Sequence, residues 1–220
     1  SLQAAGYQAS LTSIPAGEAH KTLQTTAQLW QTFLEHGVER TSTVVALGGG
    51  VVSDLAGFAA AAYLRGVPWV ACPTTLLAMA DAGVGGKTGV DLPQGKNLVG
   101  AFHAPTLVLS DPLCLQTLPL EEQRNGLAEV LKHGVIQDSL LFEMAQQPLN
   151  RMDWESLVRR AVQVKVNIIC EDPYERGRRA ALNLGHSIGH AIELVSGFQL
   201  KHGEAVGVGM LAEARLAVLL

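Results

Sequence analysis

The sequence predicts an α/β domain with a parallel sheet, followed by an all-α domain. Residues 1–119 are rich in glycine, proline and short apolar runs, whereas residues 120–220 follow longer helical patterns. In addition, the glycine-rich turn Gly48–Gly50 directly follows a β-branched run and precedes an alanine-rich helical stretch. That order is typical of the strand–turn–helix unit of a parallel sheet. We therefore place an α/β domain at 1–119 and a helical domain at 120–220.

Short strands and helices alternate in the first domain. An amphipathic helix is predicted over 19–36, since apolar residues recur there at helical spacing and Gly37 follows it. The remaining elements are strands at 43–47, 69–72 and 107–109 and a helix at 52–64. Because parallel strands need crossover connections, the helical stretch at 52–64 fits the link between the first two strands.

Four helical patterns make up the second domain. They are a helix within 121–146 and helices at 154–170, 179–195 and 204–220. Pro148 and the pair Asp172-Pro173 end the first two, because proline lacks an N–H group and disfavours helical geometry in the residue before it. The charged stretch 174–179 is predicted to be a loop.

Composition excludes several classes of protein. With 48% hydrophobic and 16% charged residues, the chain of 220 residues is not a disordered one. A net charge of −4 argues against nucleic-acid binding, because phosphate backbones require clustered Lys and Arg. The longest apolar run, Leu55–Leu64, is about half as long as a membrane span. Three widely spaced cysteines and no visible signal peptide indicate a cytoplasmic protein, and we expect neither nucleic acid nor membrane as a partner.

Both ends of the sequence have the character of a fragment. The chain starts with serine, and residues 214–220 continue an apolar helical pattern without a stop signal. We expect a piece of a longer protein. The alternative is a genuine C-terminal helix that docks in the core.

The Gly48–Gly50 turn indicates phosphate binding. Glycines let the backbone approach a ligand, and free N–H groups at a helix N-terminus can then meet a phosphate. The spacing of these glycines differs from the dinucleotide-binding motif G-x-G-x-x-G. We therefore favour binding of a nucleotide pyrophosphate by a turn of another type, and the alternative is a tight turn that only packs the strand against the helix. Gly86–Thr88 is similar to the end of a P-loop, but Asp81 stands where that motif needs glycine.

Three histidines, His186, His190 and His202, fall within seventeen residues of one another. His186 and His190 are four apart on one predicted helix and face the same way, so spacing alone favours them as a pair of metal ligands. An equally weighted alternative is that one of them is a hydrogen-bonded core histidine. Glu129 is flanked by apolar residues on its predicted helix, and a buried carboxylate is usually paired or metal-bound. A catalytic zinc requires three such ligands and one open position.

Several basic residues lie in apolar or glycine-rich contexts, which indicates a polar cavity. They are Arg65, Lys87, Lys96, Lys132, Lys165 and Arg179. Cations gathered near a metal predict an anionic substrate that carries phosphate and carboxylate groups. For any single one of them, the alternative is a surface side chain whose apolar stem is covered.

Seven motifs follow one another along the chain: GGGVVSDLAG (48–57), PTTLL (73–77), GGKTGV (85–90), GKNLVG (95–100), GLAEVLK (126–132), NLGHSIGHAIE (183–193) and HGEA (202–205). Together they resemble the 3-dehydroquinate synthase family. The resemblance implies an NAD-binding α/β domain and a helical domain with the active site between them. It also implies conversion of 3-deoxy-D-arabino-heptulosonate 7-phosphate to 3-dehydroquinate and phosphate. The steps are oxidation by NAD, phosphate elimination, reduction by NADH and an intramolecular aldol closure.

The resemblance assigns roles to individual residues. It implies a divalent metal, zinc with cobalt as the alternative, held by Glu129, His186 and His202, and it leaves His190 to substrate phosphate and proton transfer. Catalytic roles fall on Lys87, His190, Lys132, Asn97 and Arg65, and substrate binding on Asp81, Lys165, Arg179 and Asn183. NAD contacts fall on Glu18, Lys21, Gly49, Gly50, Asp54, Thr74, Thr75, Lys87, Lys96, Cys114 and Thr117. The expected small-molecule partner is a phosphorylated sugar acid, and the expected assembly is a homodimer.

Three alternatives to this function stay open. The first is another sugar phosphate cyclase, against which the intact segments 85–90 and 95–97 argue. The second is a metal-dependent polyol dehydrogenase of a related fold, against which the dense basic set argues, because its substrate is neutral. The third is an inactive fragment that only binds NAD.

Overall fold

A parallel three-stranded sheet forms the centre of the N-terminal half in the computed structural model, which describes residues 2–197 and 199–219. The strand order is β1 (Val44–Gly48), β2 (Trp69–Pro73) and β5 (Leu107–Val108). In the register, Val44 lies opposite Trp69, and Val70 lies opposite Leu107. The predicted parallel sheet is confirmed.

The alanine-rich helix α2 (Gly50–Ala62) connects β1 to β2 and is enclosed on two sides. One side packs Ala56 and Ala60 against the sheet, and the other contacts α1 (Leu23–Glu35) through Leu29. Small side chains are required because both neighbours approach closely. At Gly57 a Cβ atom would lie 3.0 Å from the Cζ2 atom of Trp69 on β2.

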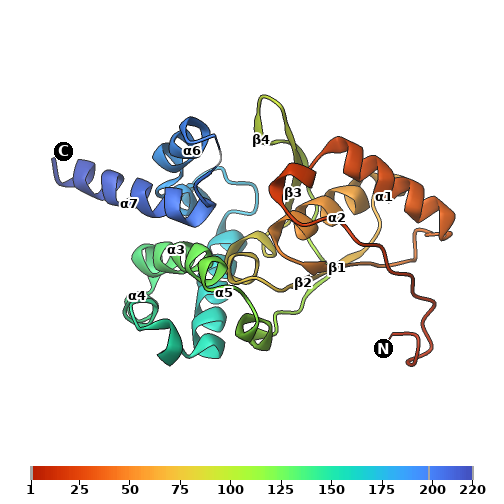
Figure 1. Cartoon of the computed structure of the whole chain (residues 1–220), viewed down its shortest axis with the longest axis horizontal. Coiled ribbons are helices and arrows are strands. Elements are labelled where there is room, and N and C mark those ends of the chain that lie inside the picture. Colours follow the sequence, from red (N-terminus) through yellow and green to blue (C-terminus); the bar gives the residue numbers. More distant parts are fainter. Residues whose placement is uncertain (1, 198, 220) are drawn as a thin grey trace.

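An antiparallel hairpin of β3 (Lys87–Leu92) and β4 (Gly95–Phe102) was not anticipated from the sequence. Its strands pair across glycines, and a Cβ atom on Gly100 would lie 2.1 Å from the carbonyl oxygen of Thr88. The hairpin places Lys87, Lys96 and Asn97 on the cavity described below. In Figure 1 it rises beside α2, opposite the helical half of the molecule.

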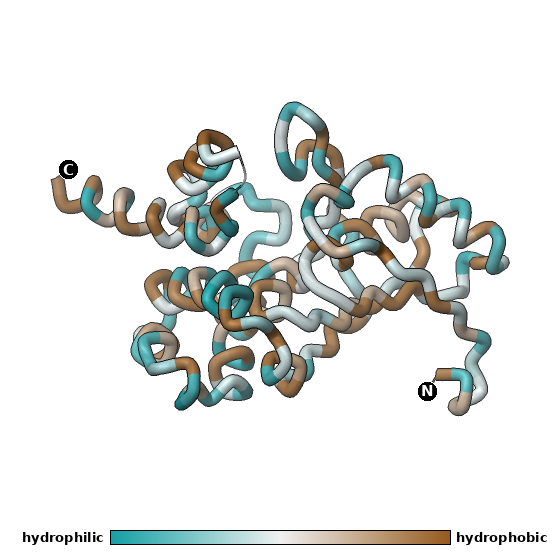
Figure 2. The backbone as a smooth tube through the Cα atoms, in the orientation of Figure 1, coloured by the Kyte–Doolittle hydropathy of each residue, from teal (hydrophilic) through white to brown (hydrophobic). Residues whose placement is uncertain are grey.

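Five α-helices form the C-terminal half as the structure describes it: α3 (Leu120–Gln137), α4 (Ser139–Ala145), α5 (Trp154–Glu171), α6 (His186–Val195) and α7 (His202–Leu219). Their core includes Val130, Leu141, Leu157 and Ile168. No helix of residues 2–197 and 199–219 combines the length and the apolar character needed to cross a membrane. In Figure 2 the strands of the sheet are largely brown, whereas much of the chain between the two halves is white to teal.

Two predicted helices are interrupted. Within 121–146 the chain breaks at Asp138, whose side chain accepts a hydrogen bond from Leu141 N and begins α4. The single helix predicted over 179–195 is wrong, because a 3₁₀ helix at Arg178–Asn183 precedes α6 and Gly185 between them is left-handed, with φ 80°. This break sets the direction of α6, which begins at His186.

Candidate active site

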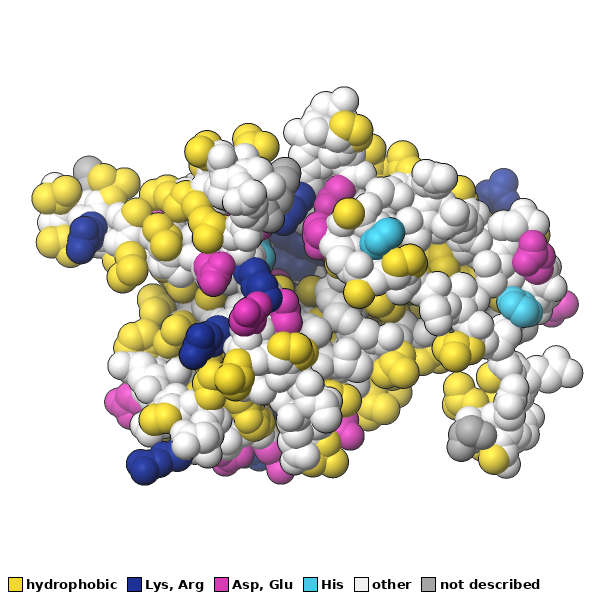
Figure 3. Space-filling model, viewed as in Figure 1, with side chains coloured by type: hydrophobic (Ala, Val, Ile, Leu, Met, Phe, Trp, Pro, Cys, Tyr) yellow, Lys and Arg dark blue, Asp and Glu magenta, His cyan; other side chains and the backbone are white. Residues whose placement is uncertain are grey.

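A cavity of about 640 Å³ lies between the α/β half and the helical half. Figure 3 shows it as a hollow near the middle of the molecule, with basic and acidic side chains around it. Helices α2, α3, α5, α6 and α7 and the β3–β4 hairpin all contribute to its wall. The predicted site residues on this wall are Glu18, Lys21, Gly50, Asp54, Asp81, Lys87, Lys96, Asn97, Lys132, Lys165, Arg179, Asn183, His186, His190 and His202.

Other predicted site residues lie away from the wall. Glu129 is completely buried behind it. Gly49 and Thr75 face each other, since a Cβ atom on Gly49 would lie 3.1 Å from Thr75 Cγ2, so the glycine turn and the PTTLL motif are neighbours. Four further predicted residues do not line this cavity. Thr74 donates its backbone N–H to Gly48 O, Arg65 is exposed, and Cys114 and Thr117 lie on the segment after β5.

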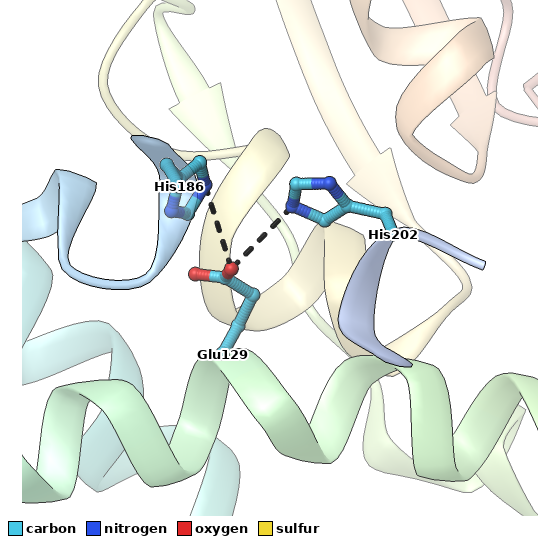
Figure 4. Close-up of side chains that lie close together, drawn as sticks. All are labelled: Glu129, His186 and His202. Atoms are coloured by element: carbon cyan, nitrogen blue, oxygen red, sulfur yellow. Dashed lines mark ion pairs between the residues drawn. The ribbon is translucent and has the colours of Figure 1, made fainter. Parts of the chain in front are cut away.

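Glu129, His186 and His202 converge from α3, α6 and α7 (Figure 4). Glu129 Oε1 lies 3.7 Å from His186 Nε2 and 3.5 Å from His202 Nε2. These distances are too long for ordinary hydrogen bonds, so the buried Oε1 atom has no hydrogen-bond partner, whereas Oε2 pairs with Lys132. Donors around a tetrahedral zinc, with bonds of about 2.1 Å, are roughly 3.4 Å apart. The three side chains therefore fit a divalent metal.

Both imidazoles turn the same ring nitrogen toward Glu129. His186 Nδ1 lies 3.3 Å from the carbonyl oxygen of Leu184, and His202 Nδ1 lies 3.6 Å from Glu193 Oε1. An acceptor beside Nδ1 favours the tautomer with its proton there, which leaves the Nε2 lone pair free. Both histidines consequently present Nε2 as a ligand atom.

Electrostatics keep the carboxylate of Glu129 ionised. Burial alone would raise the pKa of Glu129, but its ion pair with Lys132 outweighs this effect and lowers the pKa to about 2. Burial alone would also lower the pKa of His202, but Glu129 and Glu193 raise it to about 9. The local field around His202 is thus negative: it favours a second proton on the ring in the absence of metal, and a bound metal cation would take the place of that proton on Nε2.

A second set of possible ligand atoms belongs to His190, Glu193 and His202. Glu193 Oε1, however, already accepts a hydrogen bond of 2.9 Å from Lys96 Nζ, whereas Glu129 Oε1 has no such partner, because the ion pair with Lys132 is made by Oε2. The rings of His186 and His190, the pair favoured by spacing, meet edge to face with centroids 5.2 Å apart. The unsatisfied Oε1 atom, which faces both Nε2 atoms, therefore favours the set of Glu129, His186 and His202.

Cationic side chains form another part of the wall. Lys165 donates hydrogen bonds to the backbone and side-chain oxygens of Asp81, and burial lowers the pKa of Lys165 although Asp81 opposes this. Buried Arg179 donates to the carbonyl oxygens of Pro173 and Gly85. Together with Lys132, these groups make this part of the cavity suited to an anion.

Two acidic residues, Glu175 and Glu193, form ion pairs with predicted site residues, although the sequence analysis did not predict either of them. Glu175 forms an ion pair with Lys87 and accepts a hydrogen bond of 2.6 Å from Asn183 Nδ2. Glu193 pairs with Lys96, as described above. Glu193 carried the same sequence signal as Glu129, a carboxylate between apolar neighbours on a helix. Glu175 stands in a charged loop and carried none.

Lys21 faces three carboxylates on the other side of the cavity. Its Nζ atom lies 2.9 Å from Asp54, 3.2 Å from Glu18 and 3.7 Å from Asp91. Burial opposes the charged form of Lys21, but Asp54 and Glu18 outweigh it and raise its pKa. One lysine cannot neutralise three acids, and burial raises the pKa of Asp54 to about 6 despite the ion pair with Lys21.

Comparison with protein-family models gives two matches that together cover most of the chain. The model for the N-terminal part of 3-dehydroquinate synthase matches residues 11–125, and the model for its C-terminal part matches residues 126–220. The 3-dehydroquinate synthase of Rippkaea orientalis is 51% identical over an alignment of 229 positions, gaps included, which spans 100% of this chain and 63% of that protein. The enzyme of Nostoc sp. is 50% identical over 99% of this chain and 62% of its own length. The chain thus spans less than two thirds of the length of these relatives.

Solved structures share the fold. A 2-deoxy-scyllo-inosose synthase complexed with carbaglucose-6-phosphate, NAD+ and Co2+ matches with a TM-score of 0.86 and 34% identity, over 92% of this chain and 58% of that one. The 2-epi-5-epi-valiolone synthase from Streptomyces hygroscopicus, with NAD+ and Zn2+ bound, matches with a TM-score of 0.82 and 37% identity, over 90% of this chain and 57% of that one. A probable glycerol dehydrogenase from Sinorhizobium meliloti matches with a TM-score of 0.58 and 17% identity, over 87% of this chain and 60% of that one. This match shows a shared fold alone.

Proposed function

Because this chain belongs to the 3-dehydroquinate synthase family, we propose that it carries the NAD- and metal-dependent site of a 3-dehydroquinate synthase. The reaction converts 3-deoxy-D-arabino-heptulosonate 7-phosphate to 3-dehydroquinate and phosphate. The observation that supports this best is the buried Glu129, whose unsatisfied Oε1 atom faces two Nε2 atoms on the wall of a cation-rich cavity. We also propose a cytoplasmic homodimer, which sedimentation and fractionation would test.

Glu129, His186 and His202 would hold the metal. Related solved cyclases contain Zn2+ in one case and Co2+ in another, and the carboxylate and imidazole donors found here suit both ions. When bound, the metal makes a coordinated hydroxyl more acidic and NAD takes and returns a hydride. His190 lies beside the ligand set on the cavity wall, where it would accept or return a proton of the substrate.

The substrate phosphate and carboxylate would lie among the cavity cations. Lys132, Lys165 and Arg179 are almost completely buried, so their attraction for an anion is weakly screened by water. Lys87 and Asn183 would bind substrate after release from Glu175. Asn97 on the hairpin completes this part of the wall, and exposed Arg65 is assigned a catalytic role on the resemblance alone.

NAD would lie along the α/β half. The turn Gly48–Gly50 opens α2, so its backbone N–H groups can bind the pyrophosphate. Lys21 and Asp54, which are in contact, would bind polar groups of the cofactor. Thr74 and Thr75 adjoin the same turn.

Product analysis tests this function. Purified protein with zinc, NAD and the heptulosonate phosphate should release phosphate and form 3-dehydroquinate without net NADH. Net NADH formation would instead indicate a polyol dehydrogenase. Turnover of glucose 6-phosphate or sedoheptulose 7-phosphate in place of this substrate would indicate another cyclase. Bound NAD and zinc without any turnover would indicate an inactive NAD-binding chain.

Three alanine variants test the assignment of the histidines. H186A and H202A should lose bound metal, measured by elemental analysis after dialysis. H190A should retain metal and lose turnover. Equal loss of metal in all three would contradict the assignment.

A further inference from the structure

Glu193 is an acidic residue with a buried side chain outside the proposed ligand set. It lies in the last turn of α6 between Ile192 and Leu194, and its side chain is only 2% exposed. A buried carboxylate is costly unless it is paired. The contacts of Glu193 therefore indicate what this residue does.

One oxygen of Glu193 faces two predicted site residues from different parts of the chain. Oε1 accepts a hydrogen bond of 2.9 Å from Lys96 Nζ on β4 and lies 3.6 Å from His202 Nδ1 at the start of α7. Lys96 is 97 residues away in the sequence, so this contact connects the hairpin to the helical half. The carboxylate thus occupies a fixed position beside the imidazole.

The position of that oxygen determines which nitrogen of the His202 ring is left to bind a metal. At 3.6 Å the negative charge of Glu193 acts on Nδ1 by electrostatic attraction, which favours the proton on that atom and leaves Nε2 facing Glu129 Oε1, 3.5 Å away. The main-chain oxygen of Leu184 stands in the same relation to His186. Each histidine therefore has an acceptor beside Nδ1. For His186 it is a hydrogen bond of 3.3 Å to the main chain, and for His202 it is a longer electrostatic contact that depends on a side chain.

We propose that Glu193 is a positioning residue that fixes the tautomer and orientation of His202 for metal binding, and that Lys96 holds Glu193 in place. This inference rests on the proposed metal site. It also connects the cofactor half to a metal ligand, because Lys96 is a predicted NAD contact. The alternative, Glu193 as a direct ligand together with His190 and His202, would require the ion pair with Lys96 to break.

Metal affinity of E193A, E193Q and E204Q tests the proposal. Affinities for Zn2+ and Co2+ are measured by competition with a chelator, and far-UV circular dichroism checks folding. Loss of an outer partner of a ligating histidine costs about ten- to a hundredfold in affinity, so E193A should bind metal that much more weakly. E193Q keeps an acceptor oxygen and should retain most of the affinity. Exposed Glu204, two residues from His202, makes E204Q the control, which should match the wild type.

Two spectroscopic measurements separate positioning from a general structural effect. Nitrogen-15 NMR of His202 in the metal-free proteins, at alkaline pH where the imidazole is neutral, should show its proton on Nδ1 in the wild type and in E193Q, and a mixture of tautomers in E193A. The visible bands of bound Co2+ should keep their position in E193Q. Wild-type affinity in E193A would overturn the proposal. Equal loss in E193Q and E193A with shifted Co2+ bands would overturn it in favour of a direct ligand. A wild type without metal affinity would overturn the metal site itself.

Discussion

Gly209 of α7 lies directly against the carbonyl oxygen of Gly185, the residue that precedes α6. A Cβ atom on Gly209 would lie 2.0 Å from that oxygen and 3.0 Å from the backbone nitrogen of Gly189. Two helices can approach this closely only where neither carries a side chain. Because α6 begins with His186 and α7 with His202, this contact sets the separation of two proposed metal ligands.

We expect G209A to weaken metal binding. The added methyl group must push α6 from α7, which separates the two imidazoles and costs about 1–3 kcal/mol of folding free energy, as overpacking usually does. Zinc affinity should fall at least tenfold, as measured by chelator competition.

G207A is the matched control for that variant. Gly207 lies on the same helix, and a Cβ atom there would have nothing within 4 Å. Replacing a helical glycine by alanine stabilises a helix by roughly 0.5–1 kcal/mol, so G207A should retain metal and unfold no more easily than the wild type. Equal metal affinity in G209A and G207A would show that the close contact does not set the ligand separation.

A second prediction concerns pH and Asp54. Burial raises the pKa of Asp54 from 3.8 to about 6, so the folded protein binds this proton more tightly than the unfolded chain. The contribution of Asp54 to stability therefore falls as pH rises from about 4 to 6. This difference in pKa, in which the attraction of Lys21 is already included, corresponds to roughly 3 kcal/mol.

The stability of D54N relative to the wild type should consequently increase from pH 4, where the two are similar, to pH 7, where D54N should be more stable by up to about 3 kcal/mol. Urea unfolding of both proteins at the two pH values measures this difference. E18Q removes another carboxylate near Lys21, but an exposed one, and should show a smaller change. A variant that loses stability relative to the wild type at pH 7 would show that the attraction of Lys21 outweighs burial.

Local signals made much of the fold predictable. A β-branched run followed by three glycines predicts a strand and the start of a helix, because both elements are determined by residues adjacent in the sequence. Glu129 was recognised for a similar reason, since its apolar neighbours place a carboxylate inside the protein. The split near 185 was missed because nothing before His186 marks Gly185 as left-handed rather than helical.

Contacts between distant segments were not predictable in this way. The β3–β4 hairpin contains glycines at 89, 95 and 100, which lower its strand signal, and it depends on close pairing of backbones. The ion pairs of Glu175 with Lys87 and of Glu193 with Lys96 join residues far apart in the chain. Only the folded chain shows that both lysines are already paired.

A last prediction concerns the buried pair of Asp81 and Lys165. Lys165 is 6% exposed and donates to Asp81, while the positive charges of Lys165 and Lys132 hold the pKa of Asp81 well below its usual range, against the effect of burial. D81N would leave Lys165 buried without this carboxylate, and removal of one partner of a buried pair costs roughly 3–5 kcal/mol. K165M should cost less, because Asp81 keeps the attraction of Lys132 and its side chain is 27% exposed.

Urea unfolding at pH 7 measures both losses, and inorganic phosphate provides an independent readout. In D81N the uncompensated lysine should attract phosphate, so the anion should raise the unfolding midpoint more in D81N than in the wild type, and less in K165M. Sulfate at equal ionic strength tests anion binding in general, and chloride controls for screening. Equal destabilisation in the two variants, with no difference in the phosphate effect, would show that Asp81 does not neutralise the charge of Lys165 on this wall of the cavity.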